Sequence, residues 1–137
     1  MKRLAALLLC LLVFAAGCRK QADSLPPPTE LAAAWPENQY TQGVPQPGFG
    51  QVERALLDEG RGYCAVWLSG LEQGDAAAYQ AALEEAGFAQ AEAVSEEVAG
   101  QGYASHGLLY TNGEIWVSLA YLEDNSGSMA LFLSRRA

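Results

Sequence analysis

The segment GLLYTNGEIWVSLAYL, residues 107–122, contains the clearest folding signal in the chain. Asn112-Gly113 readily adopts the positive φ angles of a type I′ turn, which is a preferred connection within a β-hairpin. The residues on both sides of this turn are rich in β-branched, aromatic and other apolar side chains, as in half-buried strands. We therefore predict that residues 103–111 and 114–122 form two neighbouring antiparallel strands.

Further strands and one helix flank this hairpin. Residues 74–88 show the spacing of an amphipathic helix, with Asp75 as the expected N-cap and Gly87 at the C-terminal end. Apolar or alternating residues predict additional strands at 51–58, 62–70, 91–98 and 129–134. The expected fold is α+β: a mostly antiparallel sheet of five to six strands with one helix packed on one face.

A proline-rich segment, WPENQYTQGVPQPGFG, precedes the first predicted strand at residues 35–50. A continuous helix is excluded by its three prolines, Pro36, Pro45 and Pro47. The segment is nevertheless too apolar for a simple linker. We expect an extended strap that lies on the domain with Trp35 and Phe49 as its anchors, and the alternative is a disordered segment.

The N-terminus carries a targeting signal. A short basic start, Met1-Lys2-Arg3, precedes an uncharged stretch at 4–17, which is shorter than the roughly 20 residues of a membrane span. Its length suits the apolar region of a secretory signal, and it ends in small residues before Cys18. This pattern resembles the lipobox of bacterial lipoproteins, in which the cysteine is lipidated and the chain is cut just before it. An ordinary secretory signal is the alternative, because Ala15 stands where the usual lipobox has leucine.

The expected domain organisation follows from this signal. Residues 1–17 are a signal peptide that is removed, 18–34 are the lipidated cysteine with a flexible linker, and 35–137 form a single α+β domain. The protein would then be exported and anchored to the extracytoplasmic face of the cell membrane through lipid on Cys18. The residue after Cys18 is Arg19 and not Asp. In a Gram-negative cell this would favour the outer membrane.

The charge balance excludes some partners. The chain has 8 basic and 16 acidic residues, for a formal net charge of −8. Removal of residues 1–17 takes away Lys2 and Arg3 and no acid, which leaves 6 basic against 16 acidic residues and a net charge of −10. A surface this acidic argues against nucleic-acid binding and against electrostatic adhesion to anionic lipid.

Few residues are available for metal binding or catalysis. Cys10 leaves with the signal and Cys18 is consumed by lipidation, so that Cys64 and the single histidine, His106, remain. Two such ligands cannot build a four-coordinate zinc site, and we expect neither a metal nor a cofactor. Cys64 and His106 would form a nucleophile and base only if their strands were neighbours. Since Cys64 lies within an apolar strand, we interpret it as a buried core residue and predict no catalytic residue.

Alternation within the strands points to a binding surface. Trp67 and Tyr63 alternate with Cys64, Val66 and Leu68, and Trp116 alternates with the aliphatic residues of 114–122. If the aliphatic faces meet the helix, Trp67, Trp116 and Tyr63 share the opposite face. Such a row of aromatic side chains could receive a protein, a peptide or a glycan. The interpretation that we favour is instead that the strap covers this row as a second small core.

Several short motifs resemble those of a domain family of unknown function in small Gram-positive lipoproteins. They are Trp35-Pro36-Glu37-Asn38, Val44-Pro45-Gln46-Pro47-Gly48-Phe49-Gly50, Gly87-Phe88 and Asn112-Gly113, within residues 35–134. The resemblance implies membrane tethering and supplies no catalytic residue.

Together these observations predict a membrane-anchored lipoprotein of the cell envelope that acts as a non-catalytic binding or accessory module. Its expected partner, apart from the membrane, is an envelope protein or peptide. A structural or inhibitory lipoprotein that acts through the loops at 99–107 or 123–128 is the alternative. A small hydrolase that uses Cys64 and His106 is the third hypothesis.

Overall fold

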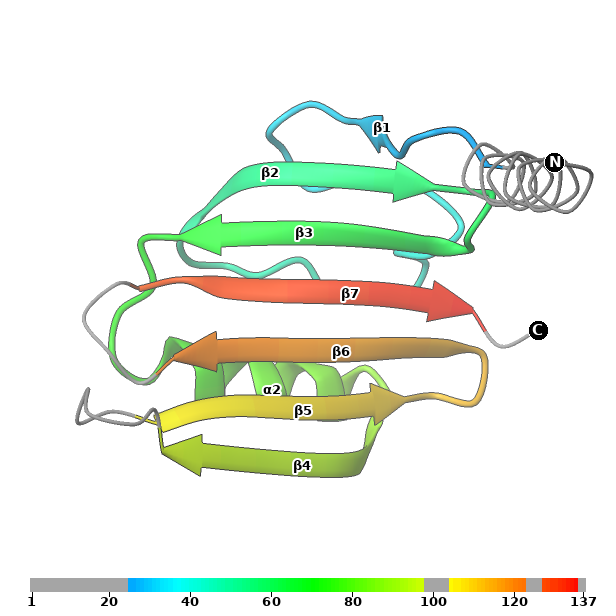
Figure 1. Cartoon of the computed structure of the whole chain (residues 1–137). Helices are drawn as coiled ribbons and strands as arrows, with labels where there is room; N and C mark the ends of the chain where they lie inside the picture. The colour runs from blue at the N-terminus through cyan, green and yellow to red at the C-terminus, as the bar shows by residue number, and fades with distance from the viewer. Residues whose placement is uncertain (1–24, 98–103, 123–126, 136–137) are drawn as a thin grey trace, which may run out of the picture.

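The computed structural model describes residues 25–97, 104–122 and 127–135. They form one antiparallel sheet of seven strands in the order β1-β2-β3-β7-β6-β5-β4, with one helix behind it (Figure 1). The elements are β1 (Thr29–Glu30), β2 (Gln51–Asp58), β3 (Tyr63–Ser69), α2 (Asp75–Glu85), β4 (Ala89–Glu97), β5 (Ala104–Thr111), β6 (Ile115–Leu122) and β7 (Met129–Arg135).

The expected fold class, a sheet of five to six strands with one helix packed on one face, is wrong. Among the described residues the sheet has seven strands, and the one helix has only 11 residues. The unexpected strand is β1, which lies within the segment assigned to the linker. Two residues are too few for a periodic pattern, and β1 is held by its partner instead. Thr29 pairs with Leu57 of β2, and the carboxylate of Glu30 lies 2.8 Å from the Nε of Arg54.

The hairpin around Asn112-Gly113 forms, but its turn differs from the predicted one. β5 and β6 are paired with Thr111 opposite Trp116. A type I′ turn needs positive φ at two successive residues, whereas only Gly113 has it here, at 96°. The side chain of Asn112 instead accepts hydrogen bonds from the backbone N–H groups of Glu114 and Ile115, both at 2.9 Å. The predicted type I′ turn is therefore wrong, although the strand pairing is confirmed.

The helix is also shorter than predicted. Gly74, with φ of 92°, is the N-cap in place of Asp75, and the helix runs from Asp75 to Glu85. The carboxylate of Asp75 accepts a hydrogen bond from the backbone of Glu72 at 2.7 Å and so belongs to the preceding turn. Gly87, with φ of 93°, ends the helix and leads into β4.

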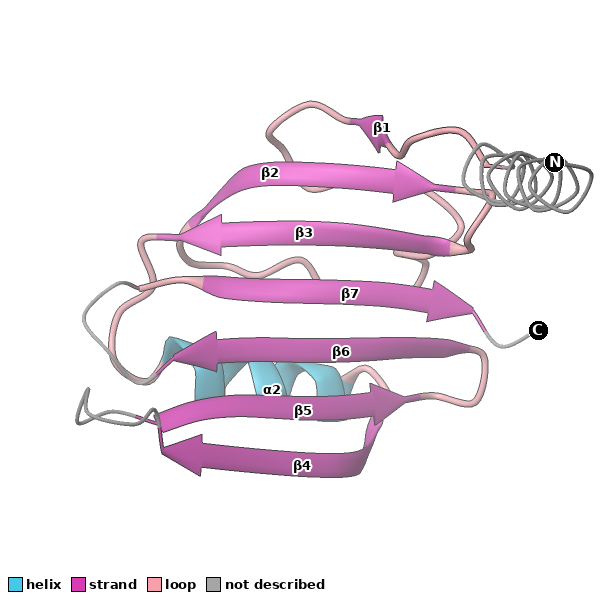
Figure 2. Ribbon diagram, in the orientation of Figure 1, coloured by secondary structure: helices cyan, strands magenta, loops and turns pink. Residues whose placement is uncertain are grey.

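The helix and the proline-rich strap lie on the same side of the sheet. Figure 2 shows α2 behind β5 and β6, and the loop of residues 31–50 behind β2, β3 and β7. Tyr79 and Leu83 of the helix and Tyr40 and Val44 of the strap are all buried in one hydrophobic cluster. The helix therefore covers only part of this face, and the strap covers the rest.

A hydrogen bond and an aromatic contact join the strap to the helix, and a further hydrogen bond shapes the strap itself. The Tyr79 hydroxyl donates a hydrogen bond to the carbonyl oxygen of Pro45 at 2.9 Å, and Phe49 meets the Tyr79 ring edge-on. The Asn38 side chain accepts a hydrogen bond from the backbone of Tyr40 at 2.8 Å, which shapes the turn that buries Tyr40. Backbone groups in the strap are thereby paired without a ladder of strand hydrogen bonds.

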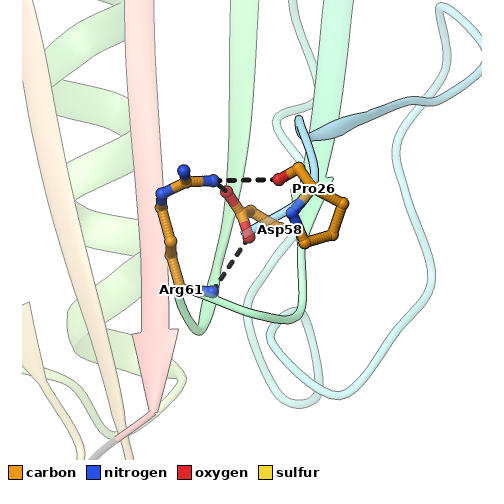
Figure 3. Close-up of polar contacts among 3 residues, drawn as sticks. All are labelled: Pro26, Asp58 and Arg61. Atoms are coloured by element: carbon orange, nitrogen blue, oxygen red, sulfur yellow. Dashed lines mark hydrogen bonds and ion pairs between the residues drawn. The ribbon is translucent and has the colours of Figure 1, made fainter. Parts of the chain in front are cut away.

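A buried carboxylate ties the first described residues to the β2–β3 turn. Asp58 is 4% exposed and accepts hydrogen bonds from the backbone N–H of Arg61 at 2.9 Å and from its guanidinium at 2.7 Å. The same guanidinium donates to the carbonyl oxygen of Pro26 at 3.2 Å (Figure 3). The hydrogen bond from the Arg61 side chain is the main reason why the pKa of Asp58 lies below its ordinary value of 3.8.

The substitution Asp58→Asn is expected to lower the free energy of unfolding at pH 7. A carboxyl group with a lowered pKa stabilises the fold above its ordinary pKa, and this stabilisation is lost as the pH falls through the folded-state value. Urea unfolding between pH 7 and pH 2 should therefore show a deficit that narrows toward acid. Glu59→Gln, at the exposed neighbouring residue, is the control and should behave as the unsubstituted protein does. A deficit of equal size at all pH values would contradict this account.

Candidate binding face

The face of the sheet opposite α2 and the strap, called the open face below, is covered by no described segment (Figure 1). Cross-strand pairing assigns its residues in rows that run across the strands. Because side chains alternate along a strand, successive rows on this face are two residues apart. Two adjacent rows lie near the middle of the sheet, and a third lies toward the C-terminal end of β7.

The small row forms a shallow depression. Its members, paired in succession from β3 to β4, are Trp67, Ala130, Ala120, Gly107 and Val94. A hollow of about 550 Å³ lies here, lined largely by apolar groups. The three central residues have short side chains or none, and a Cβ at Gly107 would meet no atom within 4 Å. The absence of side-chain bulk therefore creates the hollow.

The adjacent row, called the large row, contains the exposed side chain of Phe132. Its members are Leu56, Ala65, Phe132, Ser118 and Leu109. Phe132 is 45% exposed, although its ring stacks on that of Tyr63 with 4.4 Å between the centroids. An exposed phenylalanine beside an apolar hollow is unusual on a surface that contacts only water.

The three aromatic residues predicted for this face do lie on it, but they do not form one continuous row. Tyr63 and Trp116 belong to a third row, in which they are separated by Ser134 of β7. Trp67 is two strands away from Trp116 and four residues further along the strand direction, so the two residues are about 16 Å apart. Phe132 was missed, although the alternation in MALFLS, residues 129–134, already separates it from Leu131 and Leu133.

The favoured interpretation that the strap covers the aromatic row is wrong. Trp35, Tyr40, Val44 and Phe49 pack with the core cluster on the helix side of the sheet. Sequence alternation shows that two faces of each strand carry apolar residues, but it does not show which face the strap selects. The consequence is that Tyr63, Trp67 and Trp116 remain on the uncovered face.

Described charges lie toward the margins of the open face. The guanidinium of Arg54 lies 5.3 Å from the centre of the Trp67 ring and is also paired with Glu30. The Glu53 carboxylate accepts hydrogen bonds from Ser69 and Gln51, and these bonds lower its pKa below the ordinary value of 4.5. Both residues belong to β2, near one edge of the sheet. The middle of the face is uncharged.

The structure does not bring Cys64 and His106 together. Cys64 is fully buried on β3, where the Asn38 side chain donates to its sulfur at 3.5 Å, and burial raises the pKa of the thiol. His106 lies on β5, where its Nδ1 is 2.7 Å from the Ser95 hydroxyl and its ring stacks on Tyr121. Three strand spacings and four residues separate Cys64 from His106, or about 20 Å. A nucleophile-base pair is not formed.

Other predicted features lie wholly or partly outside the described residues. Cys18 and the signal segment 1–17 precede them, and the predicted loops at 99–107 and 123–128 are described only from residue 104 and from residue 127 onward, respectively. Within the described ranges, no three His, Cys, Asp or Glu residues are grouped as metal ligands would be. The helix of the described chain is neither long nor apolar enough to cross a membrane.

Comparison with known proteins identified no similar protein. No family model, no curated protein and no solved structure matches the sequence or the fold.

Proposed function

We propose that this protein is a membrane-tethered, non-catalytic binding module of the cell envelope and that its open face receives a partner protein. The observation that carries the proposal is that only one face of the sheet is covered by described segments. Both the helix and the strap pack on one side, while Phe132, Val94 and Leu122 are 39–49% exposed on the other. Val94 and Leu122 line the same apolar hollow, and Phe132 lies two residues along β7 from Ala130, which also lines it. Exposed apolar surface of this kind is typical of a site of interaction.

The chemistry of the open face favours a protein over a small polar ligand. Its centre is apolar and uncharged, whereas sites for small molecules usually combine a deep pocket with a few convergent polar groups. Aromatic side chains around a shallow hollow resemble the anchors of protein interfaces, in which a few such residues supply most of the binding energy. The separation of Cys64 from His106 removes the geometric basis for the hydrolase hypothesis.

The tether in this proposal rests on the sequence LLVFAAGCRK at residues 11–20. Two or three acyl chains on one cysteine would hold the chain stably on a membrane without a spanning helix. Cys18→Ser should therefore move the protein from the membrane fraction to the soluble fraction. Retention of the variant in the membrane fraction would contradict this part of the proposal.

Cross-linking of the tagged protein in its own membrane, followed by mass spectrometry, tests the binding role. One dominant captured protein is expected, and Phe132→Asp should reduce its capture at least about 10-fold, because a charge would enter the centre of an apolar contact. Ala78→Asp adds the same charge at an exposed position on α2, behind the sheet, and should leave capture unchanged. Circular dichroism would verify that both variants are folded.

If no protein is captured, or if Phe132→Asp and Ala78→Asp behave alike, the open face is not the binding site and the proposal fails.

A further inference from the structure

We propose that the partner of the open face is a second copy of this chain, packed sheet against sheet. The two copies are related by a two-fold axis that runs perpendicular to the strands, between the small row and the large row. The proposal rests on the proposed function, because it names the occupant of the same face. The axis passes over β7 at the level of Leu131, between Ala130 and Phe132. Such an axis stacks each strand on its own counterpart in the partner and reverses its direction.

The two central rows are complementary in size under this symmetry. Each residue of the large row faces the residue of the small row that comes from the same strand of the partner. Phe132 then faces Ala130, Leu109 faces Gly107, and Ala65 faces Trp67. In these three pairs a large side chain meets a small one, whereas Ser118 faces Ala120, a pair of small residues. The Phe132 ring of one copy thus enters the hollow beside Ala130 of the other. Side chains interdigitate in this way between the sheets of a β-sandwich.

The flanking rows contain one pair of a large and a small residue and one pair of large apolar residues. The row that contains Tyr63 and Trp116 faces the row that contains Ser69 and Leu122. Tyr63 thus meets Ser69, and Trp116 covers Leu122, which is 39% exposed in the single chain. Phe132 and Leu122 would both be covered by one symmetric contact, whereas Val94 would lie opposite Glu92 of the partner copy.

The area of the face agrees with a stable dimer. Six strands about 4.8 Å apart and roughly 24 Å of strand length give a projected area of about 700 Å² per copy. Specific interfaces bury about 800 Å² per partner. The open face is therefore large enough for a two-sheet contact.

The charges permit stacking of the faces and oppose pairing of the edges. Arg54 faces Leu56 of the partner and Glu92 faces Val94, so no two like charges in these rows lie directly opposite each other. Edge-to-edge pairing along β4 is disfavoured, since this strand carries Glu92 and a register shift between Gln90 and Glu92. Face-to-face packing is the arrangement that the described residues favour.

Sedimentation of the purified full chain with Cys18→Ser, under reducing conditions, measures the association without lipid. A dimer is expected, and Phe132→Asp should weaken it at least about 30-fold, whereas Ala78→Asp should not. Association should strengthen with added salt, because the two copies carry net negative charge of the same sign. An association that weakens with salt would show that the two copies meet through oppositely charged groups instead of the apolar open face, and this would overturn the proposal.

A size swap tests the register of the contact. Gly107→Leu places a leucine opposite Leu109 of the partner and should weaken the dimer about 10-fold or more. The single chain should accept this substitution, since a Cβ at Gly107 meets open space. The double variant Gly107→Leu/Leu109→Ala exchanges the sizes of the facing residues and should restore the dimer. Failure of the second substitution to restore association would overturn the two-fold arrangement.

The two proposals can fail separately. A monomer in solution, together with capture in the membrane of a different protein that is lost in Phe132→Asp, would overturn the dimer and leave the binding role intact. A monomer without specific capture would overturn both.

Discussion

Tyr79→Ala is expected to lower the free energy of unfolding by about 3–5 kcal/mol, as truncation of a buried aromatic residue does. The Tyr79 side chain is 1% exposed and joins three parts of the molecule. Its ring lies in the core between helix and sheet and makes a T-shaped contact with Phe49, and its hydroxyl donates to the carbonyl oxygen of Pro45. A small domain is stable by only about 5–15 kcal/mol, so urea unfolding should show a large fall in the midpoint.

Tyr79→Phe is the matched variant for the hydroxyl. It keeps the ring and removes only the hydrogen bond to the strap, for an expected loss of about 1–2 kcal/mol. Burial raises the pKa of Tyr79 above its ordinary value of 10.0, so the phenol remains a donor at neutral pH. Proteolysis within residues 35–50 should increase in both variants, because each loosens the strap. Equal stability of Tyr79→Ala and the unsubstituted chain would show that the strap and helix do not share a core.

Gly50→Ala is the second substitution with a large expected effect, about 3 kcal/mol of lost stability. Gly50 connects the strap to β2 with φ of 65°, a region in which L residues are strained by about 1–2 kcal/mol. A Cβ at this position would also lie 2.5 Å from the carbonyl oxygen of Ser69, so the backbone would have to move. Both costs add in this one residue.

Gly43→Ala separates the two costs. Gly43 has a similar φ of 75°, but nothing lies within 4 Å of the added carbon. Its substitution should therefore cost only the conformational strain, about 1–2 kcal/mol. Urea unfolding of the two variants measures the difference, and equal losses would contradict the close approach of Gly50 to β3.

Local signals were sufficient for most of the individual elements. The Asn112-Gly113 turn and the alternation around it predicted the pairing of β5 with β6, because a hairpin is specified by residues that are close in sequence. The helix was found within a few residues of its ends for the same reason. Alternation also placed Tyr63, Trp67 and Trp116 on one face, since the side-chain period of a strand is two whatever the strand's neighbours are.

Long-range contacts determined the rest. β1 could not be predicted, because two residues have no period and Glu30 finds Arg54 only after the sheet has formed. The strap could not be assigned to a face, since apolar side chains point both ways from β3 and β6.

The small row is the clearest example of a feature that local sequence patterns do not predict. Ala130, Ala120 and Gly107 are ordinary residues in three separate strands, and only cross-strand register places them side by side. The sequence by itself thus determined the strands and which residues share a face, through local periodicity. The tertiary structure alone decided which face was left open and where its hollow lies, because that depends on packing between segments that are distant in the chain.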